Sequence, residues 1–269
     1  MTYASPATTI VRDRDLPTRF MGFPRRHGPP GIRNLVIILP VVAGAHVVAQ
    51  RIASRVPGTV AVPYLDDGVS GREDEAMTDR VLIGAAAGPN VAALLLVNLA
   101  DDGRDGRIAD QALKRSPGRP VETLSIEACG GSLRAIATGA ERAQALLNAV
   151  SGATRSEFPV SELIMAAECG GSDATSGMAS NPTVGVAADI LIDFGGTVCF
   201  SETTEMMGAE HILARRASSD AVARRIIEIV ANVEKAANAV GATVAGGNPT
   251  RSEEHTSELQ SRFGISYAV

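Results

Sequence analysis

Short apolar runs alternate with helical segments along this chain, and that alternation constrains the fold more than any other feature of the sequence. The runs 35–41 and 91–99 consist almost entirely of Ile, Val, Leu and Ala, with no alternating polar face. Strands of this kind are buried on both faces, as in parallel sheets that helices cover on both sides. Parallel strands also need a crossover connection, usually a helix. We therefore predict an α/β fold with a parallel, Rossmann-like sheet and helices on both faces.

The same pattern sets the expected elements. The predicted strands are short apolar runs, at residues 35–41, 59–63, 91–99, 121–126, 161–167 and 197–200. The predicted helices have apolar residues at helical spacing, at residues 46–56, 76–87, 107–114, 133–150, 183–194, 209–216 and 219–240. The segment 103–106 is expected to form a surface turn. The sequence has neither a dinucleotide-binding glycine motif nor a P-loop, so we predict no site of either kind.

Charge and cysteine usage exclude several classes of protein. The net charge of −5, without a long basic run, argues against nucleic-acid binding. No apolar stretch is long enough for a membrane span, and the first residues lack the order of a signal peptide. Cys129, Cys169 and Cys199 are too few and too scattered for a disulfide framework or a structural zinc site. We therefore expect a cytoplasmic protein with free thiols.

The two ends differ from the body of the chain. Residues 1–18 are polar and unpatterned, and we expect a disordered lead-in there. From Arg251 the sequence reads Arg-Ser-Glu-Glu-His-Thr-Ser-Glu-Leu-Gln-Ser, which matches the translation of a common sequencing-library adapter. Our hypothesis is that residues 251–269 are artefact and that the α/β region 19–250 is incomplete at its C-terminus. The alternative is a genuine polar tail.

Polar residues gather where the predicted strands end. The junctions at 64–68, 127–132, 168–173 and 201–205 carry carboxylates, thiols, hydroxyls or paired glycines. Ligands of parallel α/β sheets bind outside the carboxyl ends of the strands, so we expect the four junctions to share one rim. Paired glycines at a helix start suit an anionic ligand, and carboxylate, thiol and imidazole groups suit a divalent metal. The alternative is that these residues are helix caps and tight turns.

Single residues at these places also have two interpretations. His211, on a predicted helix, is either structural or a ligand, and His46 at a helix start is equally open. Arg33 could pair with a substrate carboxylate or form a surface salt bridge. Cys199 lies inside an apolar run, and we expect it to be a core thiol.

Several segments together resemble the altronate/galactarate dehydratase family over residues 19–250, most strongly over 160–217. The segments that carry the resemblance are Gly22-Phe23-Pro24-Arg25, Gly31-Ile32-Arg33-Asn34, Cys169-Gly170-Gly171-Ser172-Asp173, Asn181-Pro182, Ser201-Glu202-Thr203, Gly208-Ala209-Glu210-His211 and Asn248-Pro249-Thr250. The last looks like the start of a further family motif that is cut in the middle.

The resemblance implies an enzyme that removes water from a sugar acid to give a 2-keto-3-deoxy acid, with divalent iron or manganese as cofactor. A proton next to a carboxylate is only weakly acidic, so the enediolate needs a cation. The expected catalytic residues are Cys169, Asp173, Glu202, Glu205 and His211. Among these we expect His211, Glu205 and Asp173 to hold the metal. The expected substrate-binding residues are Arg33, Asn34, Gly170, Gly171, Ser172 and Asn181.

The chain also departs from the family pattern. Members commonly carry cysteine or histidine ligands after the first three strands, whereas this chain has Ala-Gly-Ala-His at 43–46, Tyr-Leu-Asp-Asp-Gly at 64–68 and Asn-Leu-Ala-Asp-Asp at 98–102. These changes mark either a branch with a harder metal or another substrate, or a member that has lost catalysis.

Three functions therefore remain open. The first is sugar-acid dehydration, and the second is the elimination of sulfite from sulfolactate, an activity of the same family. The third is a non-catalytic subunit that binds carboxylates or pairs with an active chain. The family's small substrate-covering domain is absent here, so we expect a separate small subunit as a possible partner, and an oligomer is possible. We expect residues 1–269 alone to be poorly soluble and inactive.

Overall fold

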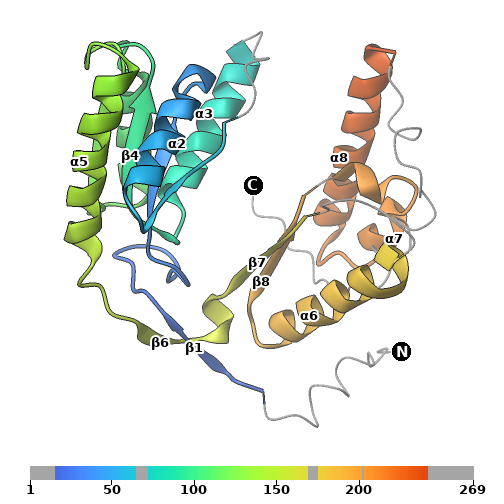
Figure 1. The fold of residues 1–269 in the computed structure, drawn as a ribbon. Coiled ribbons are helices and arrows are strands. Elements are labelled where there is room, and N and C mark those ends of the chain that lie inside the picture. The colour runs from blue at the N-terminus through green and yellow to red at the C-terminus, as the bar shows by residue number, and fades with distance from the viewer. Residues whose placement is uncertain (1–15, 65–71, 169–174, 202, 242–269) are drawn as a thin grey trace. The chain divides into compact units, whose positions relative to one another are not determined.

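The computed structural model describes residues 16–64, 72–168, 175–201 and 203–241 (Figure 1). The chain divides into two compact units. The N-terminal unit comprises residues 21–158, and the C-terminal unit comprises residues 159–269 together with residues 1–20. Each unit is described by itself.

A four-stranded sheet forms the centre of the N-terminal unit. Its strands, in spatial order, are β3 (Thr59–Ala61), β2 (Leu35–Pro40), β4 (Val91–Asn98) and β5 (Val121–Ser125). All three pairings are parallel, and Ile38 lies opposite both Ala61 and Leu95. Every residue of β4 is buried, because β4 has neighbours on both sides and helices on both faces. The predicted parallel α/β fold is confirmed.

Two pairs of helices cover the two faces of this sheet. The helices are α2 (His46–Arg55), α3 (Arg72–Ala87), α4 (Arg104–Arg115) and α5 (Ser132–Val150). One core cluster joins Ile38 and Leu95 to α2 and α5. The other joins Leu39 and Leu96 to α3 and α4. Neighbouring residues of a strand point to opposite faces, so each apolar run supplies both cores.

The contact between α2 and α5 depends on a glycine. A Cβ atom built at Gly139 of α5 would lie 2.3 Å from Cδ1 of Ile52 in α2. Ile52 is completely buried. Because real atoms do not approach so closely, only glycine fits at position 139 without a shift of the neighbouring side chain.

The C-terminal unit is built around a second, smaller parallel sheet. Strands β7 (Ile164–Ala167) and β8 (Thr197–Phe200) form it, with Ile164 opposite Thr197. The helices of this unit are the π-helix η3 (Ser176–Ser180), α6 (Asn181–Asp193), the short helix η4 (Thr203–Met206), α7 (Glu210–Ala214) and α8 (Asp220–Ala239). Met206, Leu213, Ile226 and Val230 form the core cluster that joins η4, α7 and α8.

Two short strands were not predicted from the sequence. They are β1 (Arg19–Gly22) and β6 (Ser156–Pro159), which pair in a two-stranded sheet of their own. Each has only four residues and no apolar run, so periodicity could not reveal them. The 3-10 helix η2 (Val160–Glu162) occupies the first residues of the run that we expected to be strand from 161.

Three further expectations were wrong. Strands β3 and β5 belong to one sheet and strands β7 and β8 to another, so the four junctions do not follow the strands of a single sheet. Helix α4 begins at Arg104, which places Gly106 inside a helix instead of in a turn. Cys199 is exposed, not a core thiol, because residues alternate between exposed and half-buried along β8.

Candidate functional site

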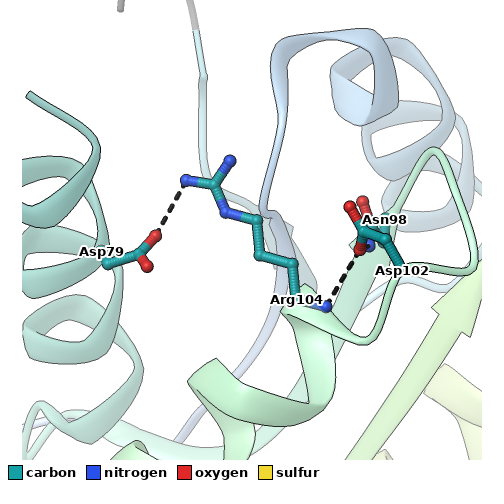
Figure 2. A network of polar contacts seen from close by, with 4 residues as sticks. All are labelled: Asp79, Asn98, Asp102 and Arg104. Carbon is teal, nitrogen blue, oxygen red and sulfur yellow. Dashed lines mark hydrogen bonds and ion pairs between the residues drawn. The ribbon is translucent and has the colours of Figure 1, made fainter. Parts of the chain in front are cut away.

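A buried amide stands at the carboxyl end of β4, where ligands of parallel sheets bind (Figure 2). The Asn98 side chain is 1% exposed. Its Nδ2 donates to Oδ1 of Asp102 over 2.7 Å and to Oδ1 of Asp105 over 3.5 Å, and its Oδ1 accepts from the backbone N–H of Leu99 over 2.8 Å. The amide therefore uses both its donor and its acceptor groups to shape the loop after β4.

Asp102 connects this amide to the start of α4. Its Oδ1 also accepts from the backbone N–H of Arg104 over 3.0 Å, next to Gly103, which has a φ of 72°. The N–H of Arg104 first, and the Asn98 amide second, lower the pKa of the Asp102 carboxyl below its ordinary value. The Arg104 guanidinium pairs with Asp79 of α3 at 2.8 Å (Figure 2). The network thus holds α3, β4 and α4 at this edge of the sheet.

The loop after β5 is attached to the loop after β4. Oε2 of Glu127 accepts from the backbone N–H of Asp101 over 3.2 Å, and the N–H of Glu127 donates to the carbonyl oxygen of Leu99 over 3.0 Å. Cys129 is half-buried and packs against the core beneath α2 and α5. Gly131, the N-cap of α5, has a φ of 112°, and no side chain caps that helix start. The carboxylates and the thiol of these two loops therefore lie at one edge.

His46 joins the same edge from the start of α2. Its Nδ1 accepts from the backbone N–H of Tyr64 over 3.2 Å. A neutral imidazole whose Nδ1 accepts carries its proton on Nε2. His46 therefore ties the segment after β3 to α2 through one of its two ring nitrogens. A described contact thus favours a structural role for His46.

Arg33 and Asn34, two expected substrate ligands, stand at the opposite edge, before the first residue of β2. Asn34 accepts from Arg25 over 3.0 Å through its Oδ1 and donates to the carbonyl oxygen of Val150 over 3.2 Å. Arg33 is exposed, and its backbone N–H donates to the side chain of Asn90. The structure does not bring these two residues together with the loops that follow the strands.

Arginines of this opposite edge bind backbone carbonyls. Arg25 donates to the carbonyl oxygen of Pro89 over 2.6 Å, and Arg119 donates to those of Ala86 and Gly88 at the end of α3. Desolvation by burial, followed by the charge of Arg25, lowers the pKa of Arg119 to about 10. Arg25, which belongs to the motif of residues 22–25, therefore has a structural role: it holds the turn that leads into β4.

Most of the residues expected to carry the chemistry belong to the C-terminal unit. Those that lie outside the described residues are Cys169, Gly170, Gly171, Ser172, Asp173 and Glu202. Glu205 lies in η4, but its side chain is outside the described part as well. His211 is exposed on α7, and Asn181 is half-buried at the start of α6. This expected set therefore stays a prediction.

Glu210, the residue before His211, was quoted in the family motif but was not among the expected site residues. Its Oε2 is buried and has no hydrogen-bond partner in the described part of the chain. Leaving a buried polar atom unpaired costs about 1–3 kcal/mol, and more for a charged one. The sequence does carry one signal for this residue. Glu210 is an acidic residue about one helical turn before the apolar Leu213, so the two residues lie on the same side of the helix.

The described residues do not assemble the expected metal site. Within the ranges that the structure describes, no group of three His, Cys, Asp or Glu side chains is arranged to hold a metal ion. Of the three expected ligands, only the side chain of His211 is described.

None of the described helices is both long enough and apolar enough to cross a bilayer.

Family models match both units in chain order. Residues 22–151 match the model described as "D-galactarate dehydratase/Altronate hydrolase, second domain", and residues 160–255 match "D-galactarate/Altronate dehydratase, C-terminal". The matches correspond closely to the N-terminal and C-terminal units, so the division of the chain has a counterpart in the family.

Two curated relatives are similar to most of the chain, and a third is similar to a shorter part of it. It is 38% identical over 206 residues to the (2R)-sulfolactate sulfo-lyase subunit beta of Chromohalobacter salexigens, which covers 77% of this chain and 52% of the relative. It is 30% identical over 221 residues to the altronate dehydratase of Bacillus subtilis, covering 78% and 44%. It is 43% identical over 96 residues to the galactarate dehydratase (L-threo-forming) of Escherichia coli, covering 36% and 18%.

The chain spans about half the length of the first two of these relatives, at 52% and 44%. The two family models together match most of the chain, and the relatives carry the names of the same family. The motifs of residues 22–34 and 160–217 lie inside the matched ranges. The chain belongs to the D-galactarate/altronate dehydratase family.

Proposed function

We propose that this chain is part of a metal-dependent hydro-lyase that removes water from a sugar acid of the altronate or galactarate type. The observation that carries the proposal is the match of both units, in chain order, to the second and C-terminal domains of dehydratases. The product is a 2-keto-3-deoxy acid.

The reaction needs two groups that act on neighbouring carbons. The C–H bond next to the carboxylate breaks and its electrons form a C=C bond, while the C–O bond at the next carbon breaks and the hydroxyl leaves as water after it takes a proton. The resulting enol becomes the keto acid by proton transfer to carbon. A side chain must therefore accept one proton and a side chain must donate one. Cys169, Glu202 and His211 are the candidates for these transfers.

A bound divalent cation would stabilise the enediolate and help the hydroxyl to leave. We propose Fe²⁺ or Mn²⁺ for this role, held by Asp173, Glu205 and His211. The glycine pair Gly170-Gly171 would present backbone N–H groups to the substrate carboxylate. In the N-terminal unit, the network of Asn98, Asp102 and Arg104 would keep the loops after its strands in a fixed position.

Sulfite elimination is the second candidate, and a specific observation favours it. The similarity to the sulfolactate sulfo-lyase subunit extends over 206 residues at 38% identity, higher than the 30% to the altronate dehydratase over a similar length. The chemistry is closely related, because a proton next to a carboxylate is removed and a group on the next carbon leaves. Only the leaving group differs, sulfite in place of water.

A separate partner subunit is part of the proposal. The relative from Chromohalobacter salexigens is named as a subunit beta. We propose that this chain likewise functions with a small second subunit that covers the substrate, in the cytoplasm.

The test is a turnover assay on the protein expressed from its full gene, with Mn²⁺ or Fe²⁺ present. Altronate, galactarate and sulfolactate are supplied separately, and keto acid and sulfite are measured. A keto-deoxy acid from a sugar acid supports the first candidate, and sulfite from sulfolactate supports the second. Asp173→Ala should lower the turnover by orders of magnitude, whereas Asp110→Ala, an exposed change on α4, should not. Unchanged turnover in Asp173→Ala would overturn the assigned site, and no turnover with any substrate would favour the non-catalytic alternative.

A further inference from the structure

Two half-buried arginines lie next to each other at the edge of the N-terminal unit where the strands begin. Arg25 donates through Nε to the carbonyl oxygen of Pro89 over 2.6 Å. Arg119 donates through Nη2 to the carbonyl oxygen of Gly88 over 2.9 Å. These two carbonyls are consecutive and directly follow α3, so both guanidinium groups are bound to the same turn.

Arg26 brings a third cation to this place. A Cβ atom built at Gly118 would lie 3.2 Å from Nη1 of Arg26, so the Arg26 side chain lies against the residue that precedes Arg119. Arg26 is exposed, and its side chain donates no hydrogen bond to any described residue. Arg25, Arg26 and Arg119 are called the arginine cluster below.

Two glycines leave room for the arginine cluster. A Cβ atom at Gly31 would lie 2.7 Å from Nη2 of Arg25 and 2.3 Å from the carbonyl oxygen of Pro89, so a side chain there would displace the guanidinium group. Gly118, beside Arg26, has a φ of 82°, a conformation that favours glycine. The backbone around the cluster is therefore shaped to hold the guanidinium groups close together.

Within the described ranges, no carboxylate neutralises the arginine cluster. None of its three members forms an ion pair with a described Asp or Glu. The partners of Arg25 and Arg119 are uncharged: backbone carbonyls, the amide oxygen of Asn34 and the hydroxyl of Ser116. Burial first, and the charge of Arg25 second, lower the pKa of Arg119 to about 10, as expected for neighbouring like charges.

The end of α3 offsets only part of this charge. The C-terminus of a helix carries about half a negative elementary charge. Each guanidinium group carries a full positive charge at neutral pH, because arginine stays protonated in proteins. A surplus of about two positive charges therefore remains at this edge, and it attracts an anion.

We propose that the arginine cluster binds a doubly charged oxyanion of the phosphate or dicarboxylate class. Guanidinium groups present several N–H donors in a planar fork that fits the oxygens of carboxylate and phosphate groups. Such an anion neutralises the surplus charge and accepts the donors of Arg26. The site lies at the edge opposite the loops that follow the strands, so it is separate from the proposed catalytic residues and does not rest on the proposed function.

The experiment compares the protein expressed from its full gene with its variants Arg26→Gln and Arg55→Gln. Arg26→Gln removes one charge of the cluster and breaks no described hydrogen bond. Arg55 is the matched control, because it is an exposed arginine at the same edge, at the end of α2, which packs on the other face of the sheet. Binding of inorganic phosphate and, separately, of galactarate is measured by isothermal titration calorimetry, with the ionic strength held constant by NaCl.

We expect phosphate or galactarate to bind equally well to the natural protein and to Arg55→Gln. Arg26→Gln should bind that anion about tenfold more weakly, because a charge-assisted hydrogen bond is lost. The same anion should raise the unfolding temperature of the natural protein, whereas chloride at equal ionic strength should not. Which of the two anions depends on Arg26 identifies the phosphate or the dicarboxylate class.

The other outcomes overturn the inference and leave the proposed function standing. Binding of neither anion shows that the arginine cluster is not a site. Equal weakening in Arg26→Gln and Arg55→Gln shows only a diffuse attraction to the basic edge. Galactarate that binds equally well to Arg26→Gln occupies the proposed catalytic site instead, and the inference is then wrong unless phosphate binding depends on Arg26.

Discussion

The side-chain amide of Asn98 donates a 2.7 Å hydrogen bond to Oδ1 of Asp102, four residues further along the chain. This bond joins the last residue of β4 to the approach of α4 and leaves the amide 1% exposed. The same Asp102 oxygen receives the N–H of Arg104, whose guanidinium pairs with Asp79 (Figure 2). A short polar network therefore fixes one of the loops at the carboxyl edge of the sheet.

The charge of Asp102 makes the stability of the N-terminal unit depend on pH. Its folded pKa is lowered by the N–H of Arg104 and by the Asn98 amide. The carboxylate therefore stabilises the fold above the pKa of the unfolded chain, about 3.9, and this stability is lost as the pH falls through the lower folded pKa. We expect urea unfolding to show the natural chain more stable than Asp102→Asn at pH 7. The difference in the free energy of unfolding between the two proteins should be smaller at pH 3. A difference that does not change with pH would contradict the stabilising role of the Asp102 carboxylate.

Asn98→Asp should destabilise the N-terminal unit strongly. The new carboxylate would lie where the amide now donates, 2.7 Å from one carboxylate oxygen and 3.5 Å from another. An uncompensated buried charge costs about 3–5 kcal/mol. The matched change is Asn148→Asp, on the exposed side of α5, where Gln144 donates to the side chain and can still do so. Chemical denaturation of both variants measures the difference, and equal stabilities would refute the role of the amide.

Two glycine substitutions should have opposite effects. Gly139→Ala would place a methyl group 2.3 Å from Cδ1 of Ile52, so we expect a loss of about 1–3 kcal/mol. Gly84→Ala in α3 meets no atom within 4 Å and should stabilise the fold by up to about 1 kcal/mol. Thermal unfolding checks both signs. Combining Gly139→Ala with Ile52→Val, which removes Cδ1, should recover part of the loss.

Cys199 should react with a maleimide faster than Cys129. Cys199 is exposed on β8, whereas Cys129 is half-buried against the core of the N-terminal unit. Peptide mapping by mass spectrometry after short labelling distinguishes the two thiols. Faster labelling of Cys129 would show that the exposed face of β8 is covered in solution. Unfolding in urea should make the two rates similar, which provides the control.

The family resemblance and most elements followed from sequence patterns. Predicted strands such as 197–200 agree with the structure, and helix 133–150 differs by one residue at its start. The motifs of residues 160–217 lie within the family match. The functional assignment depended on these motifs, because composition and periodicity alone indicated only an α/β protein. Metal, substrate and catalytic roles stay predictions.

The candidate site was less predictable. The sequence placed Arg33 among the substrate ligands, yet it stands before β2, at the edge opposite the loops that follow the strands. The expected residues 169–173 lie outside the described part, so their assembly is untested. Asn98 appeared in the sequence only as a departure from a family motif. Its role depends on Asp102 and Asp105, which reach it only through the turn into α4.

The sequence by itself determined the elements of the N-terminal unit and their parallel arrangement, because apolar runs and helical spacing are local properties of the chain. Only the tertiary structure decided that the six predicted strands divide between two sheets, because strand pairing joins residues that are far apart in sequence. The exposure of Cys199 and the burial of the Glu210 oxygen were decided in the same way. Burial depends on which helices pack over a residue, and local patterns do not contain that information.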